Sequence, residues 1–272
     1  LTTTGTTIVD SNTAGGTGGG LSAVGAATID GTTINNNHST TGTTTVRGGG
    51  LFAGGNLTMS NSSVTNNWTL AAGGGLSSGA IVSISNSTIS GNQSTGSTGG
   101  GIYSQSTSTI TDSTVSGNSA SSNAGGLHAV GDTTVTRSTF SGNSSSSSGG
   151  GIYRSTGNVY LYNSTLSGNT STATGSAVWT QHCTITNSTI YGNSATNAAV
   201  VGGVYKTGTC TYTNSITANN TSNGVAANCN ATPTSGGYNI ESANTCAFAG
   251  AGDLPNTNPL VNALASNGGP TQ

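Results

Sequence analysis

The chain has 272 residues, of which only 4% are charged, and its formal net charge is -2. With four basic residues it cannot neutralise a run of phosphates, which makes nucleic acid and anionic membrane surfaces poor partners. No segment approaches the roughly 20 apolar residues of a membrane-spanning helix, and abundant Thr, Ile and Val beside 45 Gly favour strands over disorder.

One short phrase, an aliphatic residue or Phe followed by two small residues and Asn, recurs along the chain. Successive copies place their Asn 24 to 30 residues apart, and a period of this size predicts a solenoid. The recurrent residues are Asn12, Asn37, Asn67, Asn92, Asn118, Asn143, Asn169, Asn193 and Asn219. Because a catalytic Asn would be singular, we expect a structural ladder in which each amide bonds neighbouring backbone or the next Asn.

Two further marks lie between the Asn positions. A Gly run ends in an aliphatic residue, as in Gly18–Leu21 and Gly149–Ile152. An alternating segment with an apolar middle residue, such as Thr109–Thr111, indicates a strand with one buried face. We therefore predict an all-β, single-stranded parallel β-helix over residues 1–222, with about 25 residues and three short strands in each of nine to ten coils. At the ~4.8 Å strand spacing this is a rod on the order of 40 to 45 Å long.

The cysteines lie only in the last third of the chain and have no Cys-x-x-Cys spacing. This pattern favours disulfides over zinc and an oxidising, extracellular compartment. Cys183 and Cys210 begin the aligned phrases CTITNSTI and CTYTNSI, so they should stack on adjacent coils and form a disulfide. The remaining pair, Cys229–Cys246, then falls in residues 223–272, for which we expect a disulfide-containing capping or anchor-like region.

An aromatic stripe is expected beside the Gly runs. The residue after the inward aliphatic should point outward, and in five successive coils it carries a ring: Tyr103, His128, Tyr153, Trp179 and Tyr205. Such a stripe is suited to stacking on sugar faces or on a neighbouring molecule. The alternative is that the rings simply shield the Gly-rich corner.

No constellation of catalytic or metal-binding residues is evident. The six acids fall at different places in the repeat and form no carboxylate pair of the kind that glycoside hydrolysis needs. The histidines are likewise scattered, so we expect no enzyme activity, no cofactor and no metal. Rows of Thr-x-Thr and Thr-x-Ser resemble ice-binding faces of other solenoids, although outward Thr is also ordinary β-propensity.

Two stretches resemble known families. Phe140–Asn143 followed by Gly150–Tyr153 resembles the repeats of chlamydial polymorphic outer-membrane proteins, which implies a surface β-helix, in many members an adhesin. Gly237–Ile240, Asn258–Leu260 and Asn267–Gln272 look like the choice-of-anchor domain that follows such repeats in bacterial secreted proteins. Neither resemblance implies catalytic residues.

These observations predict a secreted or cell-surface structural protein, such as a subunit of a fibre or surface layer. The alternative is an adhesin or carbohydrate-binding rod, with a polysaccharide-active enzyme or an ice-binding protein as weaker readings. Open strand edges at the ends of a solenoid and low surface charge favour head-to-tail self-association. Surface glycans are the other expected partner.

Overall fold

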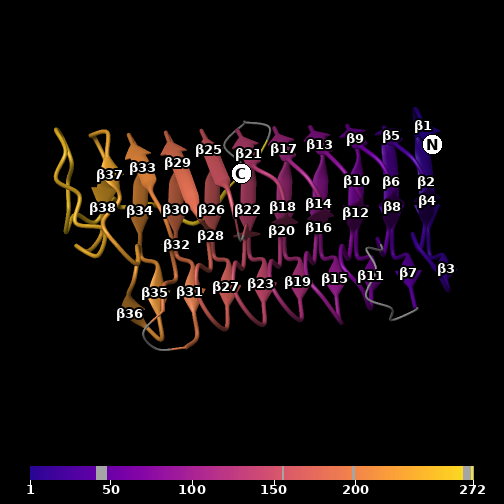
Figure 1. The fold of residues 1–272 in the computed structure, drawn as a ribbon. Helices are drawn as coiled ribbons and strands as arrows, with labels where there is room; N and C mark the ends of the chain where they lie inside the picture. The colour runs from indigo at the N-terminus through magenta and orange to yellow at the C-terminus, as the bar shows by residue number, and fades with distance from the viewer. Residues whose placement is uncertain (41–47, 155, 198–199, 266–270, 272) are drawn as a thin grey trace.

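The computed structural model describes residues 1–40, 48–154, 156–197, 200–265 and 271. These residues contain no helix and form four β-sheets stacked coil upon coil into a rod (Figure 1). Strands pair in parallel, except that β36 (Val225–Ala226) runs antiparallel to β35 (Thr221–Ser222). The parallel β-helix of about nine turns is confirmed. Each complete coil contributes four strands, so the expected three strands per coil is wrong.

Sheet A contains the alternating segments. Its strands are β1 (Thr2–Thr3), β5 (Ala27–Asp30), β9 (Leu57–Ser60), β13 (Val82–Ser85), β17 (Ser108–Thr111), β21 (Thr133–Thr136), β25 (Asn158–Tyr162), β29 (His182–Thr186), β33 (Cys210–Thr213) and β37 (Thr234–Ser235). The middle apolar residues, such as Ile110 and Leu161, are fully buried. Their neighbours, Thr109 and Thr111 beside Ile110 and Tyr160 and Tyr162 beside Leu161, face outward, as period-two alternation requires.

Sheet B contains the residues that precede each ladder Asn. Its strands are β2 (Thr7–Asp10), β6 (Thr32–Asn35), β10 (Ser63–Thr65), β14 (Thr88–Ser90), β18 (Thr114–Ser116), β22 (Thr139–Ser141), β26 (Thr165–Ser167), β30 (Thr189–Tyr191), β34 (Ile216–Ala218) and β38 (Ile240–Glu241). Each of Ile89, Val115 and Phe140 stacks on the next and is fully buried. This column is one side of the apolar core.

Sheet C follows the ladder Asn and was missed from the sequence. Its strands are β3 (Thr13–Ala14), β7 (His38–Ser39), β11 (Trp68–Thr69), β15 (Gln93–Ser94), β19 (Ser119–Ala120), β23 (Ser144–Ser145), β27 (Thr170–Ser171), β31 (Ser194–Ala195), β35 and β36. Most of its inward side chains are small hydroxyls, such as Ser94, which donates to the Ala71 carbonyl at 2.6 Å. Two-residue strands without apolar alternation give no strand pattern to detect.

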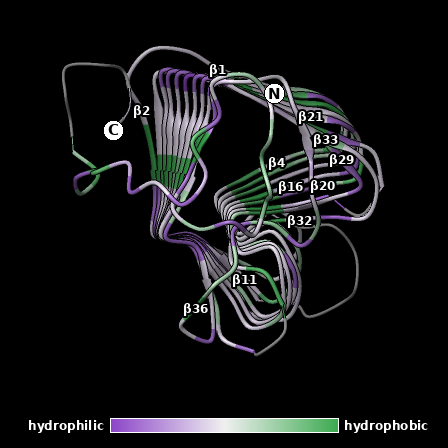
Figure 2. Ribbon diagram, turned by 90° about the vertical axis from the view of Figure 1, so that its left-hand side faces the viewer, coloured by the Kyte–Doolittle hydropathy of each residue, from purple (hydrophilic) through white to green (hydrophobic). Residues whose placement is uncertain are grey.

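Sheet D follows the Gly runs. Its strands are β4 (Leu21–Ala23), β8 (Leu51–Ala53), β12 (Leu76–Ser78), β16 (Ile102–Ser104), β20 (Leu127–Ala129), β24 (Ile152–Tyr153), β28 (Val178–Thr180) and β32 (Val204–Lys206). Leu76, Ile102 and Leu127 stack in register with no exposure. Figure 2 looks along the rod and superposes the coils, so that equivalent positions of successive coils overlap.

The Gly runs are explained by close backbone approach. A Cβ at Gly101 would lie 2.8 Å from the carbonyl oxygen of Gly126 in the next coil and 3.0 Å from the amide carbon of Asn118. No side chain fits between the chain and the ladder at this corner. Gly at this point therefore allows sheet D to follow sheet C within one compact coil.

Residues 223–257 close the C-terminal end of the rod. Strands β36, β37 and β38 extend sheets C, A and B by one short rung each, and a single bridge from Val204 to Cys229 extends sheet D. We call these residues the cap. The chain then continues along the outer face of sheet B, where residues 261–265 and the side chains of Thr165 and Thr189 line a cavity of about 250 Å³. Within the described ranges no helix is long and apolar enough to cross a membrane.

Candidate functional site

The aromatic stripe lies on the outer face of sheet D. Tyr103, His128, Tyr153, Trp179 and Tyr205 occupy one register position in five consecutive coils. All five side chains are partly exposed. The structure therefore brings together the residues that the sequence placed in the stripe.

The rings of the stripe pack against one another. Centroid separations between successive rings are 5.3, 5.1, 4.9 and 5.7 Å. The two contacts of His128 are edge-on, whereas Tyr153, Trp179 and Tyr205 stack at interplanar angles of 25° and 17°. At these separations each stacked ring covers much of its neighbour's face, and the free surface of this part of the stripe consists mainly of ring edges.

His128 is the most perturbed titratable group of the stripe. Its Nδ1 lies 2.5 Å from the Thr98 hydroxyl. Burial, aided by the nearby Arg154 guanidinium, lowers the pKa of His128 from 6.5 to about 4. The imidazole is therefore neutral at neutral pH and stabilises the stack as an uncharged ring.

The ladder asparagines lie at the corner between sheets B and C, and from Asn37 onward their side chains are buried inside the coil, whereas Asn12 at the first coil is exposed. Asn92 is representative: its Nδ2 and its backbone N–H both donate to Oδ1 of Asn118 at 2.9 Å. The second Nδ2 hydrogen reaches the Val64 carbonyl at 2.9 Å. The amide-to-amide bond recurs at every step from Asn12 to Asn193. Each amide thus replaces water for buried backbone groups of two coils.

The prediction that Asn219 is the last member of the ladder is wrong. Asn193 donates to Oδ1 of Asn220, which is fully buried, whereas Asn219 is exposed. The error arises at β34, where Thr217 and not Ile216 takes the inward position. Asn219 instead has a φ of 54°, a left-handed conformation that Gly supplies in earlier coils and that Asn tolerates better than most residues.

A second ladder, made of Ser, follows the corner between sheets A and B. The Ser87 N–H donates to the Ser113 hydroxyl oxygen at 3.1 Å, and the Ser113 hydroxyl donates to the carbonyl of Thr111 at 2.7 Å. The members are Ser62, Ser87, Ser113, Ser138, Ser164, Ser188 and Ser215. Each lies five residues before a ladder Asn, a fixed spacing that could have revealed this ladder and corrected the assignment of Asn219.

Both predicted disulfides form. Cys183 and Cys210 face one another on β29 and β33 with their Cα atoms 4.3 Å apart. They occupy an inward column of sheet A and are almost fully buried. Cys229–Cys246 lies in the cap with a Cα separation of 4.9 Å. The first bond joins two coils of the rod, and the second joins two segments of the cap.

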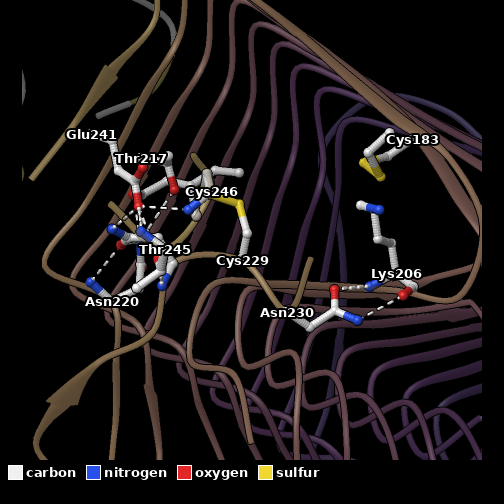
Figure 3. Close-up of a disulfide and its surroundings, with 12 residues drawn as sticks. Cys183, Lys206, Thr217, Asn220, Cys229, Asn230, Glu241, Thr245 and Cys246 are labelled. Carbon is white, nitrogen blue, oxygen red and sulfur yellow. Dashed lines mark hydrogen bonds between the residues drawn. A yellow bond between two sulfur atoms is a disulfide. The ribbon is translucent and has the colours of Figure 1, made fainter. Parts of the chain in front are cut away.

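The Asn ladder ends on a buried carboxylate in the cap (Figure 3). Asn220 donates to Asn228, and Asn228 donates to Oε1 of Glu241 at 3.2 Å. The same oxygen accepts the backbone N–H groups of Thr245 at 2.7 Å and Cys246 at 2.9 Å, and the Thr245 hydroxyl at 2.8 Å. Glu241 thereby ties the ladder to the loop that carries the cap disulfide.

The Ser ladder ends on the other acid of the cap. Ser215 donates from its N–H to Asn239, and Asn239 donates from its own N–H to Oδ1 of Asp253 at 2.8 Å. Burial raises the pKa of the Asp253 carboxyl, but hydrogen bonds from Ser235, Asn239 and Gly250 outweigh it and hold this pKa below its ordinary value. Asp253 is therefore a charged acceptor at neutral pH.

The four acids of the rod also make local contacts. Asp112 forms a two-point ion pair with Arg137 at 2.7 Å, and this contact lowers the pKa of Asp112. Asp10 and Asp30 accept from neighbouring corner side chains. Asp132 accepts a hydrogen bond from the backbone N–H of Asn158 in the next coil at 2.9 Å, and its carboxylate lies 3.7 Å from the Arg154 guanidinium. Among the described residues no group of three or more His, Cys, Asp or Glu side chains could hold a metal ion.

The fold and these internal ladders define a disulfide-containing parallel β-solenoid. Residues 137–153 match the model of the Chlamydia polymorphic membrane protein repeat. The matched segment contains Phe140, the ladder residue Asn143 and the Gly run that leads into Tyr153. No curated protein and no solved structure matches the chain. The match describes one repeat and not the whole chain.

Proposed function

We propose that this chain is a non-catalytic structural rod of an extracellular cell surface, acting as a subunit of a fibre or surface layer. The observation that carries the proposal is the pair of inner ladders, which continue from coil to coil and end on carboxylates of the cap. Such an interior resists bending and local opening, because each buried polar group bonds to the next coil. Stiffness and length are the properties that a surface rod needs.

The surface location is supported by chemistry and by similarity. Two disulfides favour an oxidising compartment, and the matched repeat belongs to a family named for membrane proteins. The resemblance of the C-terminal region to a choice-of-anchor domain belongs to the same proposal. A non-catalytic role is supported by the carboxylates, since each accepts hydrogen bonds or an ion pair from the adjacent coil or within the cap.

A second candidate is an adhesin or carbohydrate-binding rod. The feature that favours it is the stripe, which presents five partly exposed rings in a row. Contact through this stripe would involve ring edges and hydroxyl groups at its stacked part, because Tyr153, Trp179 and Tyr205 cover one another. A protein groove or a second rod fits such an edge better than the flat face of one sugar does.

Self-association is part of the structural proposal. Head-to-tail stacking through the C-terminal end would use the last strands of the sheets there, which are the two-residue strands β36, β37 and β38 and the three-residue strand β32. Contacts along the flanks of the rod could use the longer strand faces. Flank contacts are therefore the simpler route to a layer.

Electron microscopy of the native material at physiological salt tests this proposal. Filaments or ordered sheets that persist on dilution would support a structural subunit. A comparison with Tyr153→Thr/Trp179→Thr material would show whether the stripe supplies the contact. Dispersed rods of about 45 Å at every concentration would contradict the fibre and layer roles.

A further inference from the structure

The outer face of sheet A is a nearly uniform floor of hydroxyl groups. The two outward columns of β17 and β21 are Thr109 and Thr111 in one coil and Thr134 and Thr136 in the next. The same columns continue with Thr in β29 and β33. Small β-branched side chains on a flat parallel sheet leave this floor level.

One strand interrupts this floor with two aromatic rings. Tyr160 and Tyr162 of β25 occupy the two outward columns, and their ring planes are parallel within 10° with centroids 6.5 Å apart. Directly below and above them lie Thr134 and Thr136 of one coil and Thr184 and Thr186 of the other. We call these two rings the tyrosine pair.

The tyrosine pair differs from the stripe in what its rings contact. Stripe rings have aromatic neighbours in adjacent coils at 4.9 to 5.7 Å. The tyrosine pair has only Thr in those positions, so neither phenol has an aromatic neighbour in the adjacent coils. Neither phenol oxygen has a hydrogen-bond partner among the described residues, and both side chains are partly exposed.

The acids and bases near the tyrosine pair form ion pairs of opposite charge. Asp112 and Arg137 form a two-point ion pair at 2.7 Å, and Asp132, which accepts from Asn158 of β25, lies 3.7 Å from Arg154. The exposed corner next to Tyr162 is Asn163, and Asn187 follows it in the next coil. Parallel rings, hydroxyls and neutral amides together suit a ligand that is uncharged, hydroxyl-rich and flat on one side.

We propose that the tyrosine pair binds a neutral polysaccharide, whose sugar rings pack against the exposed parts of Tyr160 and Tyr162. The axial C–H groups of the sugars would contact the phenol rings, while sugar hydroxyls bond to the flanking Thr hydroxyls and the Tyr oxygens. The glycan would run along β25, across the rod axis. This site is separate from the stripe and deepens the carbohydrate-binding candidate, while the structural role of the rod stands without it.

Replacing the tyrosine pair by Thr tests the site, because Tyr160→Thr/Tyr162→Thr restores the floor of adjacent coils. The probes are the hexasaccharides of cellulose, xylan, mannan and laminarin, with polygalacturonate as a charged comparison, titrated into the intact chain by calorimetry. We expect at least one neutral probe to bind and its affinity to fall at least tenfold in the double Thr variant. Tyr160→Phe/Tyr162→Phe should keep most of the affinity, since it keeps both rings.

Trp68→Thr, which removes a partly exposed ring from β11 of sheet C, outside both the stripe and the tyrosine pair, is the control and should bind the same probe as the wild type does. Far-ultraviolet circular dichroism identifies any variant that fails to fold. If the double Thr variant does not fold, the double Phe variant decides, by transfer of saturation from its aromatic ring protons to the sugar protons. Absence of binding to all four neutral probes would overturn the proposal. So would equal affinity in the double Thr variant. Neither result bears on filament formation, which the microscopy measures independently.

Discussion

The shaft of the rod and its cap use the same kinds of polar residue in different ways. In the shaft, Asn118 bonds to the ladder Asn of the coil before it and to the ladder Asn of the coil after it, so its hydrogen-bond partners are residues of its own type. In the cap, Asn228 and Asn239 meet Glu241 and Asp253, which have no counterpart in earlier coils. The shaft repeats one pattern from coil to coil, and the cap ends this pattern with the carboxyl oxygens of Glu241 and Asp253 as acceptors.

The comparison separates two sources of stability. A shaft position is supported by two neighbours of the same type, so its loss should weaken coils on both sides. A cap position gathers several donors onto one oxygen, so its loss should release the cap and leave the shaft folded. The following predictions test this difference, from the largest expected effect to the smallest.

Asn118→Ala should lower the free energy of unfolding most, by about 4 to 5 kcal/mol, because it leaves buried groups of Asn92 and Ile89 without partners. Chemical denaturation of the variant and the wild type measures this loss. Asn163→Gly is the control: Asn163 is an exposed residue with a φ of 51°, which Gly adopts readily, so the change should stay within about 0.5 kcal/mol. Equal losses in the two variants would rule out the ladder as a main source of stability.

Glu241→Ala should open the cap at a cost of about 3 kcal/mol, since three N–H or O–H donors and the Asn228 amide lose their acceptor. Limited proteolysis followed by mass spectrometry should find new cleavage within residues 223–257 and an intact shaft. Glu241→Gln keeps an acceptor oxygen, so the protease should cleave this variant more slowly than it cleaves Glu241→Ala. Cleavage that begins in the shaft would show that the two regions do not unfold separately.

His128 should make the free energy of unfolding depend on pH in the acidic range. Its folded-state pKa of about 4 is below the ordinary 6.5, so between these values the unfolded chain takes up a proton that the folded chain does not. Stability should therefore fall as pH drops from 6.5 to 4, by up to about 3 kcal/mol. His128→Phe keeps a ring in the stripe and should remove this part of the slope in unfolding measured at pH 4.5 and 7. An unchanged slope would show that His128 is not its source.

Tyr212→Phe should have the smallest effect and the opposite sign. The Tyr212 hydroxyl is buried without a hydrogen-bond partner, and burial together with the Glu241 charge raises the pKa of this phenol. Removing the hydroxyl should stabilise the chain by about 1 kcal/mol. Above pH 10 the wild type should lose stability, because only the unfolded chain releases this proton. A variant that is less stable at pH 7 would mean that the hydroxyl has a partner in solution.

The sequence predicted the shaft well because the shaft repeats. Equivalents of Ile89, Asn92 and Ile102 recur every 24 to 30 residues, so position in the repeat indicated which side chains face inward and which cysteines meet. Sheet C escaped detection because its inward side chains are small hydroxyls such as Ser94. The error at Asn219 has a related cause, since an aliphatic residue, Ile216, marked the wrong position of a coil whose inward residue is polar.

The cap could not be predicted in the same way. Glu241 pairs in register with Thr217 and so continues the column that holds Ile, Val, Leu and Phe in the shaft. From the sequence alone a Glu is expected to point outward. Glu241 points inward because the backbone N–H groups of Thr245 and Cys246 donate to it, and the sequence gives no sign of these contacts. The stripe was placed correctly, but ring stacking depends on side-chain rotations that a register does not determine.

Hydrogen exchange of the backbone amides in the wild type and in Asn118→Ala tests the central claim most directly. If the inner ladders hold the shaft together, the N–H groups of Asn92, Asn118 and Asn143 should be among the slowest to exchange. The substitution should then accelerate exchange in the coils on both sides and less in coils further away. Fast exchange at these amides in the wild type, or acceleration confined to residue 118, would contradict the account.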